Sequence, residues 1–203
     1  MSLDELSFRS KGAAAMLLLF MVIYVLVYMR SPGIWGAPSA AGLDDFGALK
    51  SSAVDNGEWW RLVTAPLLHA NLAHLLINLA NLYVLTVLLV YFFGWLRMLV
   101  VFQASSLGGT VLSWAIGTER SVGASGALFG MLGVLVVFGW KSRHQLSIED
   151  GDFFRKTLAF WGGLSLLSGF VIPMIDNSAH IGGLLVGLAL GMIVNVLPRW
   201  RQQ

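Results

Sequence analysis

Cysteine is absent from this sequence, and charged residues are scarce. Without a thiol the chain can form neither a disulfide nor a thiolate metal site, although this leaves the redox compartment undetermined. Charged residues make up 12% of the chain, about half of the ~25% that is usual in soluble domains. The formal net charge is only +2 and no basic run with interleaved aromatic residues occurs, so nothing indicates a nucleic-acid partner.

Apolar residues are abundant instead. They make up 57% of the 203 residues, the mean hydropathy is +0.74, and 8 tryptophans are present, as expected where aromatic rings lie at the headgroup level. This composition predicts an integral, multi-pass, all-α membrane protein. No repeat or separate soluble region is visible, so residues 1–203 are expected to form a single helical-bundle domain.

Six segments approach the roughly 20 apolar residues of a membrane-spanning helix. They are residues 12–29, 72–93, 96–117, 123–140, 157–175 and 178–197. Arg9 and Lys11 before the first could indicate a signal peptide, but Tyr28–Pro32 is a poor cleavage site, so we expect a retained helix. The long connection, residues 30–71, mixes turn formers with large aromatic side chains and is expected to be structured and partly embedded.

Basic residues predict the orientation of these spans. With a cytoplasmic amino terminus, nine of the 13 lysines and arginines are cytoplasmic: Arg9, Lys11, Arg97, Lys141, Arg143, Arg155, Lys156, Arg199 and Arg201. The other four lie outside: Arg30, Lys50, Arg61 and Arg120. The second, fourth and sixth spans then begin at the outer face, so polar residues at their starts share one layer of the outer leaflet.

Ser125 lies near the start of the expected fourth span, in the string Gly123-Ala124-Ser125-Gly126. Such a string is weak evidence alone, because small residues also let transmembrane helices approach closely. At a helix start, however, unpaired backbone N–H groups lie beside the serine and could stabilise an oxyanion. Ser125 is therefore the candidate nucleophile.

His180, at the start of the expected sixth span, could accept the proton of Ser125, although a lone histidine is often a core residue. Glycines follow both residues at steps of four: Gly183, Gly187 and Gly191 in one span, and Gly126 and Gly130 in the other. Two such faces could pack closely enough for a serine–histidine hydrogen bond of about 2.6–3.2 Å. Asp176 is expected in a loop or helix cap, so a dyad is favoured over a triad.

His74 and Asn78 lie four residues apart at the start of the second span and share one helix face. Both could donate hydrogen bonds to a developing negative charge, or they could form a polar clasp between helices. His69, just before this span, is explained equally well by packing or by loop ordering. Trp60 and Arg61 in the long loop are expected to anchor it at the membrane interface, with loop ordering by Arg61 as the alternative.

Together these strings resemble the rhomboid family of intramembrane serine proteases, over nearly the whole chain from about residue 59 to residue 191. The matching residues are Trp60-Arg61, His69, His74 with Asn78, Gly123-x-Ser125-Gly126 and Ala179-His180-x-x-Gly183. Each string is common by itself, but their order and their placement on the expected helices are specific.

The resemblance implies a six-transmembrane-helix rhomboid bundle of the bacterial type, with a long structured loop between helices 1 and 2. It implies a dyad of Ser125 (nucleophile) and His180 (general base and acid), with His74, Asn78 and the Ser125 backbone N–H as oxyanion hole. The expected partners are the lipid bilayer and transmembrane protein substrates, cut near the outer face at a small residue. No cofactor or metal is implied, and the expected location is a bacterial inner membrane.

Two positions depart from the pattern of some relatives. Phe129 occupies the place of a tyrosine that packs against the histidine; phenylalanine keeps the stacking surface without the hydroxyl. Val90 replaces a glutamate, which is expected to remove a structural hydrogen bond near the cytoplasmic end and to affect stability more than chemistry.

Three other functions are less well supported. A metal-dependent hydrolase using His69, His74, His180 and Asp176 is disfavoured because the sequence has no His-Glu-x-x-His string and the four are widely spaced. A silent relative that binds transmembrane clients without cutting them would not need both Ser125 and His180. A transporter is disfavoured because charges within the expected spans are nearly absent.

Overall fold

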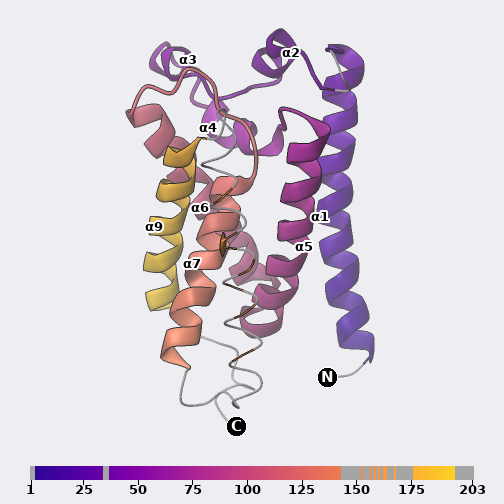
Figure 1. The fold of residues 1–203 in the computed structure, drawn as a ribbon, viewed down its shortest axis with the longest axis vertical. Coiled ribbons are helices and arrows are strands. Elements are labelled where there is room, and N and C mark those ends of the chain that lie inside the picture. The colour runs from indigo at the N-terminus through magenta and orange to yellow at the C-terminus, as the bar shows by residue number, and fades with distance from the viewer. Residues whose placement is uncertain are drawn as a thin grey trace.

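The structure, a computed structural model, describes residues 3–33, 37–142 and 176–194, and isolated positions between Asp152 and Leu167. Five long helices dominate these ranges: α1 (Leu3–Arg30), α5 (Leu72–Phe93), α6 (Trp95–Ala115), α7 (Ser125–Lys141) and α9 (Asn177–Ile193) (Figure 1). The described residues contain no β-strand beyond two isolated bridges, Pro32 with Pro38 and Leu49 with Ser121. The protein is therefore all-helical in the part that the structure describes.

Three helical segments of the described residues are long and apolar enough to cross a membrane: Lys11–Arg30, Leu72–Phe93 and Trp95–Ala115. They correspond to the first three expected spans, and α5 has the expected bounds. Helices α7 and α9 are apolar but have 17 residues each, slightly less than a full span needs. The expected fifth span, residues 157–175, lies outside the continuously described residues. These apolar helices identify an integral membrane protein.

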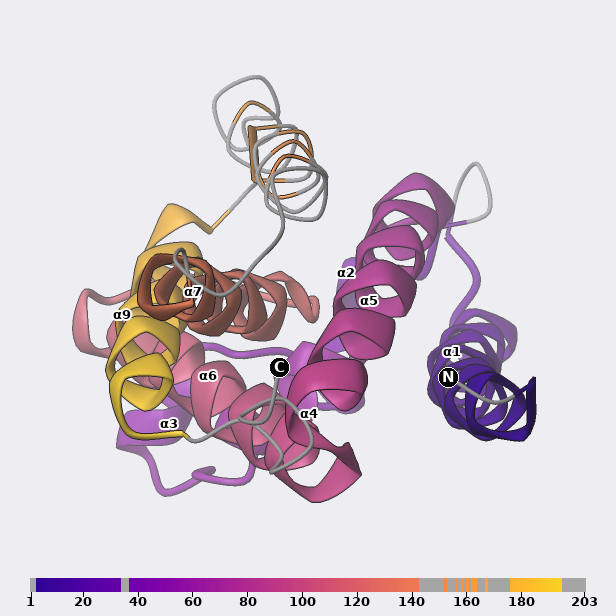
Figure 2. The same ribbon diagram turned by 90° about the horizontal axis from the view of Figure 1, so that it is seen from below.

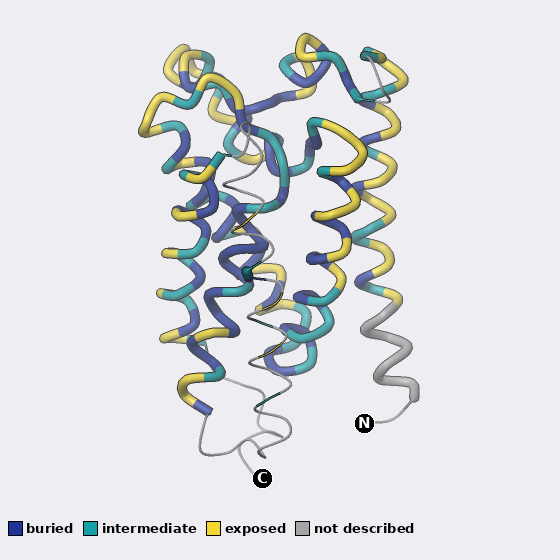
Figure 3. Tube along the Cα trace, viewed as in Figure 1, coloured by how far each residue is buried: buried dark blue, intermediate teal, exposed yellow. Residues whose placement is uncertain are grey.

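The bundle is asymmetric. Helix α9 packs against both α7 and α6, whereas α1 packs against α5 at the edge of the molecule, as the view from below shows (Figure 2). The outer side of α1 is largely exposed, and the side chains of α7 are mostly buried (Figure 3). Exposed apolar residues on α1, such as Leu18, Leu26 and Met29, are expected where lipid rather than water surrounds a helix.

Four short helices cover the end of the bundle at which α5, α7 and α9 begin (Figure 1). They are α2 (Ala40–Asp45), α3 (Ser51–Asp55), α4 (Arg61–Thr64) and the 3₁₀ helix η2 (Ala65–Leu67). We call residues 31–71 the covering segment. Short helices leave many backbone carbonyls without partners, so a segment of this kind needs side-chain donors to order it.

Arg61 supplies those donors. Its side chain donates to the Glu58 carboxylate at 2.7 Å and to the backbone carbonyls of Asp44 and Ala48, both at 2.8 Å. The residue is buried, and its guanidinium lies 4.7 Å from the centre of the Trp60 ring. The expectation that Arg61 is an interfacial anchor is therefore wrong, because the side chain is buried and three of its five N–H donors bind inside the covering segment.

Helices α7 and α9 approach each other through glycine. A Cβ atom placed on Gly183 would lie 1.9 Å from the Gly126 carbonyl oxygen, and one on Gly187 would lie 2.0 Å from the Gly130 carbonyl oxygen. No side chain fits at either position unless the backbones move apart. The predicted contact between the two glycine faces is confirmed.

Candidate active site

Ser125 and His180 meet at the end of the bundle beneath the covering segment. Ser125 is the first residue of α7, and His180 lies in the first turn of α9. The His180 Nε2 atom lies 2.9 Å from the Ser125 Oγ atom, which is a hydrogen-bond distance. His180 is buried and Ser125 is half-buried. The close packing of α7 and α9 one turn further along explains why two helix starts can place these side chains in contact.

Phe129 packs against the His180 ring, and Asp176 caps the helix turn that carries His180. The Phe129 ring stacks on the imidazole, with ring centroids 4.3 Å apart and an interplanar angle of 23°. This confirms that phenylalanine provides a stacking surface at this position. Asp176 caps the first turn of α9 by accepting a hydrogen bond from the Ala179 backbone N–H at 3.1 Å. Asp176 is thus a helix cap, as expected.

His74 lies against the chain just before Ser125. The His74 backbone N–H donates to the Asn71 Oδ1 atom at 2.8 Å. The His74 ring lies over Gly123, so a Cβ atom added to Gly123 would lie 2.6 Å from the His74 Cε1 atom. Gly123 also has a positive φ of 118°, which favours glycine. The structure therefore brings His74 to within two residues of Ser125.

Asn78 is buried one turn below His74. Its Nδ2 atom donates to the His74 backbone carbonyl at 2.8 Å, and its Oδ1 atom has no hydrogen-bond partner among the described residues. An amide nitrogen carries two hydrogens, so one donor is still available after this bond. Asn81 makes a similar bond one turn further along, from Nδ2 to the Ile77 carbonyl at 2.9 Å.

His69 is fully buried before α5 begins. Its ring contacts His74 edge-on, with centroids 5.1 Å apart, and packs in the same way against Phe20 of α1 at 5.7 Å. Burial, with a smaller contribution from His74, lowers the pKa of His69 to about 3. A neutral, buried His69 supports the packing explanation. Among the described residues, no three histidine, aspartate or glutamate side chains are grouped as metal ligands.

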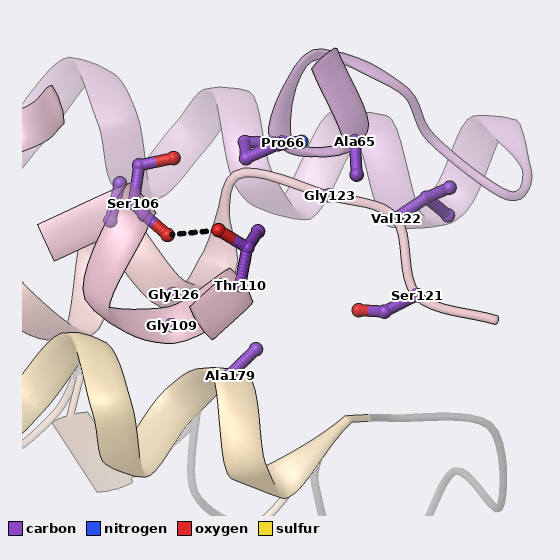
Figure 4. A pocket seen from close by; sticks show the side chains of 11 residues that line it. Ala65, Pro66, Ser106, Gly109, Thr110, Ser121, Val122, Gly123, Gly126 and Ala179 are labelled. Carbon is purple, nitrogen blue, oxygen red and sulfur yellow. Dashed lines mark hydrogen bonds between the residues drawn. The ribbon is translucent and has the colours of Figure 1, made fainter. Parts of the chain in front are cut away.

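A small pocket adjoins the start of α7 (Figure 4). Its polar lining comes from Ser106 and Thr110 of α6 and from Ser121 in the segment before α7, and Gly126 and Ala179 close its floor. The Thr110 hydroxyl donates to the Ser106 backbone carbonyl at 3.2 Å. These three hydroxyl residues were not predicted from the sequence. The spacing of Ser106 and Thr110 by four residues on one apolar helix was the available signal.

Val90 lies in the core, far along α5 from this site. It is buried among the apolar residues of α5, α6 and α7, and its carbonyl accepts the Gly94 N–H that ends the helix. A valine there adds to apolar packing, with no polar group to satisfy.

This arrangement can activate a serine. An imidazole nitrogen within hydrogen-bond distance of a hydroxyl can accept its proton, and the N–H groups of the first turn of α7 have no acceptors within that helix. The fold and site thus define a class: a helical membrane protein with a serine–histidine pair at the start of two closely packed helices.

Comparison with known proteins identifies the family. The rhomboid domain model matches residues 56–196, and the chain belongs to the rhomboid family of intramembrane proteases. It is 31% identical over 192 residues to rhomboid protease GluP of Bacillus subtilis (strain 168), covering 93% of this chain and 37% of GluP. It is 36% identical over 169 residues to RHOMBOID-like protein 5 of Arabidopsis thaliana, covering 80% of this chain and 53% of that protein.

A second plant protein, RHOMBOID-like protein 6, mitochondrial, of Arabidopsis thaliana, is 35% identical over 169 residues, which cover 80% of this chain and 52% of that protein. The chain spans between about a third and a half of the length of these three relatives. The resemblance to the rhomboid family is confirmed.

Proposed function

We propose that this chain is an intramembrane serine endopeptidase that uses Ser125 and His180 as a dyad. The observation that carries the proposal is the 2.9 Å contact between His180 Nε2 and Ser125 Oγ, made by two helices of a family of membrane proteases. In the reaction, His180 Nε2 accepts the hydroxyl proton while Ser125 Oγ attacks the scissile carbonyl carbon. The protonated His180 then donates that proton to the leaving amine, and water hydrolyses the acyl enzyme by the reverse sequence.

The oxyanion formed by this attack needs nearby donors. The Ser125 backbone N–H at the start of α7 is one candidate, because the first N–H groups of a helix have no intrahelical acceptor. His74, whose ring covers Gly123, is the second, and the unused amide hydrogen of Asn78 is the third. These three groups make up the proposed oxyanion hole.

The substrate is proposed to be the transmembrane or juxtamembrane segment of a membrane protein. A helical substrate shields its backbone, so it must unwind locally before Ser125 can reach a carbonyl. The pocket beside Ser125 is lined mostly by glycine, alanine, serine and threonine, together with Pro66 and Val122, which suits a small substrate side chain or the water required for hydrolysis. No cofactor or metal takes part in this scheme.

The proposed membrane arrangement has six spans, a cytoplasmic amino terminus and an active site toward the outer leaflet. Helix α7 has 17 residues and is therefore about 25 Å long, shorter than the ~30 Å hydrocarbon core of a bilayer. A helix of this length can begin below the outer surface of the membrane, so Ser125, its first residue, would lie within the bilayer. We propose the bacterial inner membrane as its location.

The test compares the wild-type protein with Ser125→Ala and His180→Ala, purified and reconstituted in liposomes with a single-span model substrate. Only the wild type should cut the substrate, since the nucleophile and the base act as one unit. Both variants should retain the helix content and melting temperature of the wild type.

Two outcomes would reject the proposal. Cleavage by folded Ser125→Ala at the wild-type rate would exclude the dyad. Binding of the substrate by wild type without any cleavage, under conditions where GluP cuts its own substrate, would instead support a silent relative that binds transmembrane clients.

A further inference from the structure

The Asp176 carboxylate joins the end of α6 to the start of α9. Its Oδ2 atom accepts a hydrogen bond from the Ser113 hydroxyl in the last turn of α6. Its Oδ1 atom accepts from the Ser178 hydroxyl and from the Ala179 backbone N–H of α9. One side chain thus holds α6 and α9 together at the end of the bundle where His180 lies.

Asp176 is also bonded directly to the residue that carries the base. It precedes His180 by four residues, and its backbone carbonyl accepts a hydrogen bond from the His180 backbone N–H at 3.3 Å. A carboxylate fixed to α6 therefore fixes the first turn of α9, in which His180 lies.

Ser113 of α6 provides a fixed support for the carboxylate. Ser113 is completely buried, with 0% of its surface exposed, so its hydroxyl depends on a protein partner. Helix α6 packs closely against both α7 and α9 but carries neither Ser125 nor His180. A bond from α6 to Asp176 therefore fixes the start of α9 relative to a helix outside the dyad.

We propose that Asp176 is a positioning residue, which sets the distance between Ser125 and His180 by tying the start of α9 to α6. This inference rests on the proposed function. Among the described hydrogen bonds, those of Asp176 go to hydroxyls and a backbone N–H and not to the imidazole, so this role differs from that of a triad carboxylate.

An ionised carboxylate suits this role because it only accepts hydrogen bonds and offers two oxygens to several donors. Burial alone would raise the pKa of Asp176, but the hydrogen bonds from Ser113, Ser178 and Ala179 hold this pKa below its ordinary value. The carboxylate is therefore charged at neutral pH, when all three donors can point toward it.

Two substitutions separate this role from helix capping. Asp176→Asn keeps a good N-cap, since asparagine and aspartate cap helices about equally well. The new amide, however, has only one acceptor oxygen and places a donor where the hydroxyls now donate. Ser113→Ala removes the link to α6 while leaving the carboxylate and the cap intact.

Ser178→Ala is the matched control. It removes a hydroxyl donor from the same carboxylate, but this donor lies only two residues away within α9 and connects no other segment. We expect Asp176→Asn and Ser113→Ala to lower kcat by about tenfold or more at nearly unchanged KM, because misplacement by about 1 Å can cost about 10²-fold. Ser178→Ala should stay within about twofold of wild type.

The rate at which a fluorophosphonate labels Ser125 provides a second measurement. This reagent needs an activated serine but no unwound substrate, so the labelling rate should fall with kcat in Asp176→Asn and Ser113→Ala. A role in stability alone would lower the melting temperature and leave both rates unchanged per folded molecule.

The outcomes distinguish this inference from the proposed function. If wild type cuts, Ser125→Ala does not, and both Asp176→Asn and Ser113→Ala keep the wild-type kcat and labelling rate, the positioning role is overturned while the dyad stands. An equal loss of rate in Ser178→Ala and Ser113→Ala would also overturn it, because the link between segments would then be irrelevant. If wild type does not cut at all, the proposed function itself has failed.

Discussion

Gly183 faces the Gly126 carbonyl oxygen so closely that a Cβ on Gly183 would lie 1.9 Å from it. This contact lies one residue after Ser125 on α7 and three residues after His180 on α9. The separation of the two helix backbones is therefore set next to the proposed dyad. Any side chain at position 183 must change the geometry of the site as well as the packing.

We accordingly expect Gly183→Ala to damage both stability and proteolysis. A single methyl group must push α9 away from α7, and a displacement of about 1 Å can lower the rate by about 10²-fold. The melting temperature and kcat, measured on purified protein in detergent, should both fall.

Gly163→Ala is the control for this substitution. An added Cβ at Gly163, which is also helical, has no atom of the described residues within 4 Å. Alanine there should leave activity unchanged and should not lower the melting temperature, because alanine favours a helix over glycine. If Gly183→Ala behaves like Gly163→Ala, the contact between α7 and α9 does not set the geometry of the site.

Asn78→Ala should reduce turnover by about 10²-fold without abolishing it, as expected on loss of one oxyanion donor. Asn81→Ala is a close control, because Asn81 is equally buried in α5 and also donates to the carbonyl four residues earlier. Steady-state kinetics and a thermal melt of both variants separate chemistry from helix packing. Equal loss of activity per folded molecule in the two variants would assign Asn78 to packing.

Much of the fold followed from periodicity and spacing alone. The bounds of α5 and the glycine contact of α9 with α7 were predictable, because both are properties of continuous helical segments. The meeting of Ser125 and His180 was predictable for the same reason, since each lies at the start of an apolar helix and the two helices begin at the same end of the bundle (Figure 1). Length, hydropathy and a four-residue glycine repeat were enough for these features.

Other features depend on residues that only the fold brings together. Arg61 is buried because carbonyls of Asp44 and Ala48, 17 and 13 residues away, converge on it. Ser113 and Asp176, 63 residues apart, meet only because α6 ends where α9 begins. Common residues such as serine carry no local signal for such long-range contacts, so the sequence did not predict them.

Asp44 should make the stability of the covering segment pH-dependent. Its carboxylate accepts two hydrogen bonds from Arg120, at 2.7 and 2.8 Å, and one from Lys50 at 3.2 Å. Chiefly the Arg120 bonds hold the pKa of Asp44 below its ordinary value of 3.8. The resulting stabilisation is fully present above pH 3.8 and is lost as the pH falls through the lower, folded-state pKa.

Asp44→Asn should therefore lower the melting temperature by a few degrees at pH 7. The difference in melting temperature from wild type should shrink as the pH falls below 3.8. Asp45→Asn removes the same charge from an exposed neighbour on α2 and should have little effect at either pH. Melts of the three proteins between pH 3 and pH 7 provide the measurement. A deficit in Asp44→Asn that does not change with pH would show that the ion pair does not contribute.

The proposed orientation can be measured directly, because the native chain has no cysteine. Ser52 on α3 is exposed at the end of the bundle where the proposed dyad lies, and Lys11 is exposed on the amino-terminal part of α1 at the opposite end (Figure 1). A cysteine at position 52 should react with a membrane-impermeant maleimide added to intact cells. One at position 11 should react only after the cells are permeabilised.

The site of cutting follows from this orientation. If Ser125 and His180 lie toward the outer leaflet, the enzyme can reach only the outer part of a substrate's span, and only where that span unwinds. Moving a glycine–proline pair in a model substrate from the cytoplasmic third to the outer third should therefore increase cleavage, and mass spectrometry should place the cut near a small residue in the outer third. A serine-directed inhibitor should block this cut at concentrations that leave the substrate's insertion unchanged. Preferential cutting of the substrate with the pair in its cytoplasmic third, together with the reverse labelling of positions 52 and 11, would show that the bundle is inverted in the membrane.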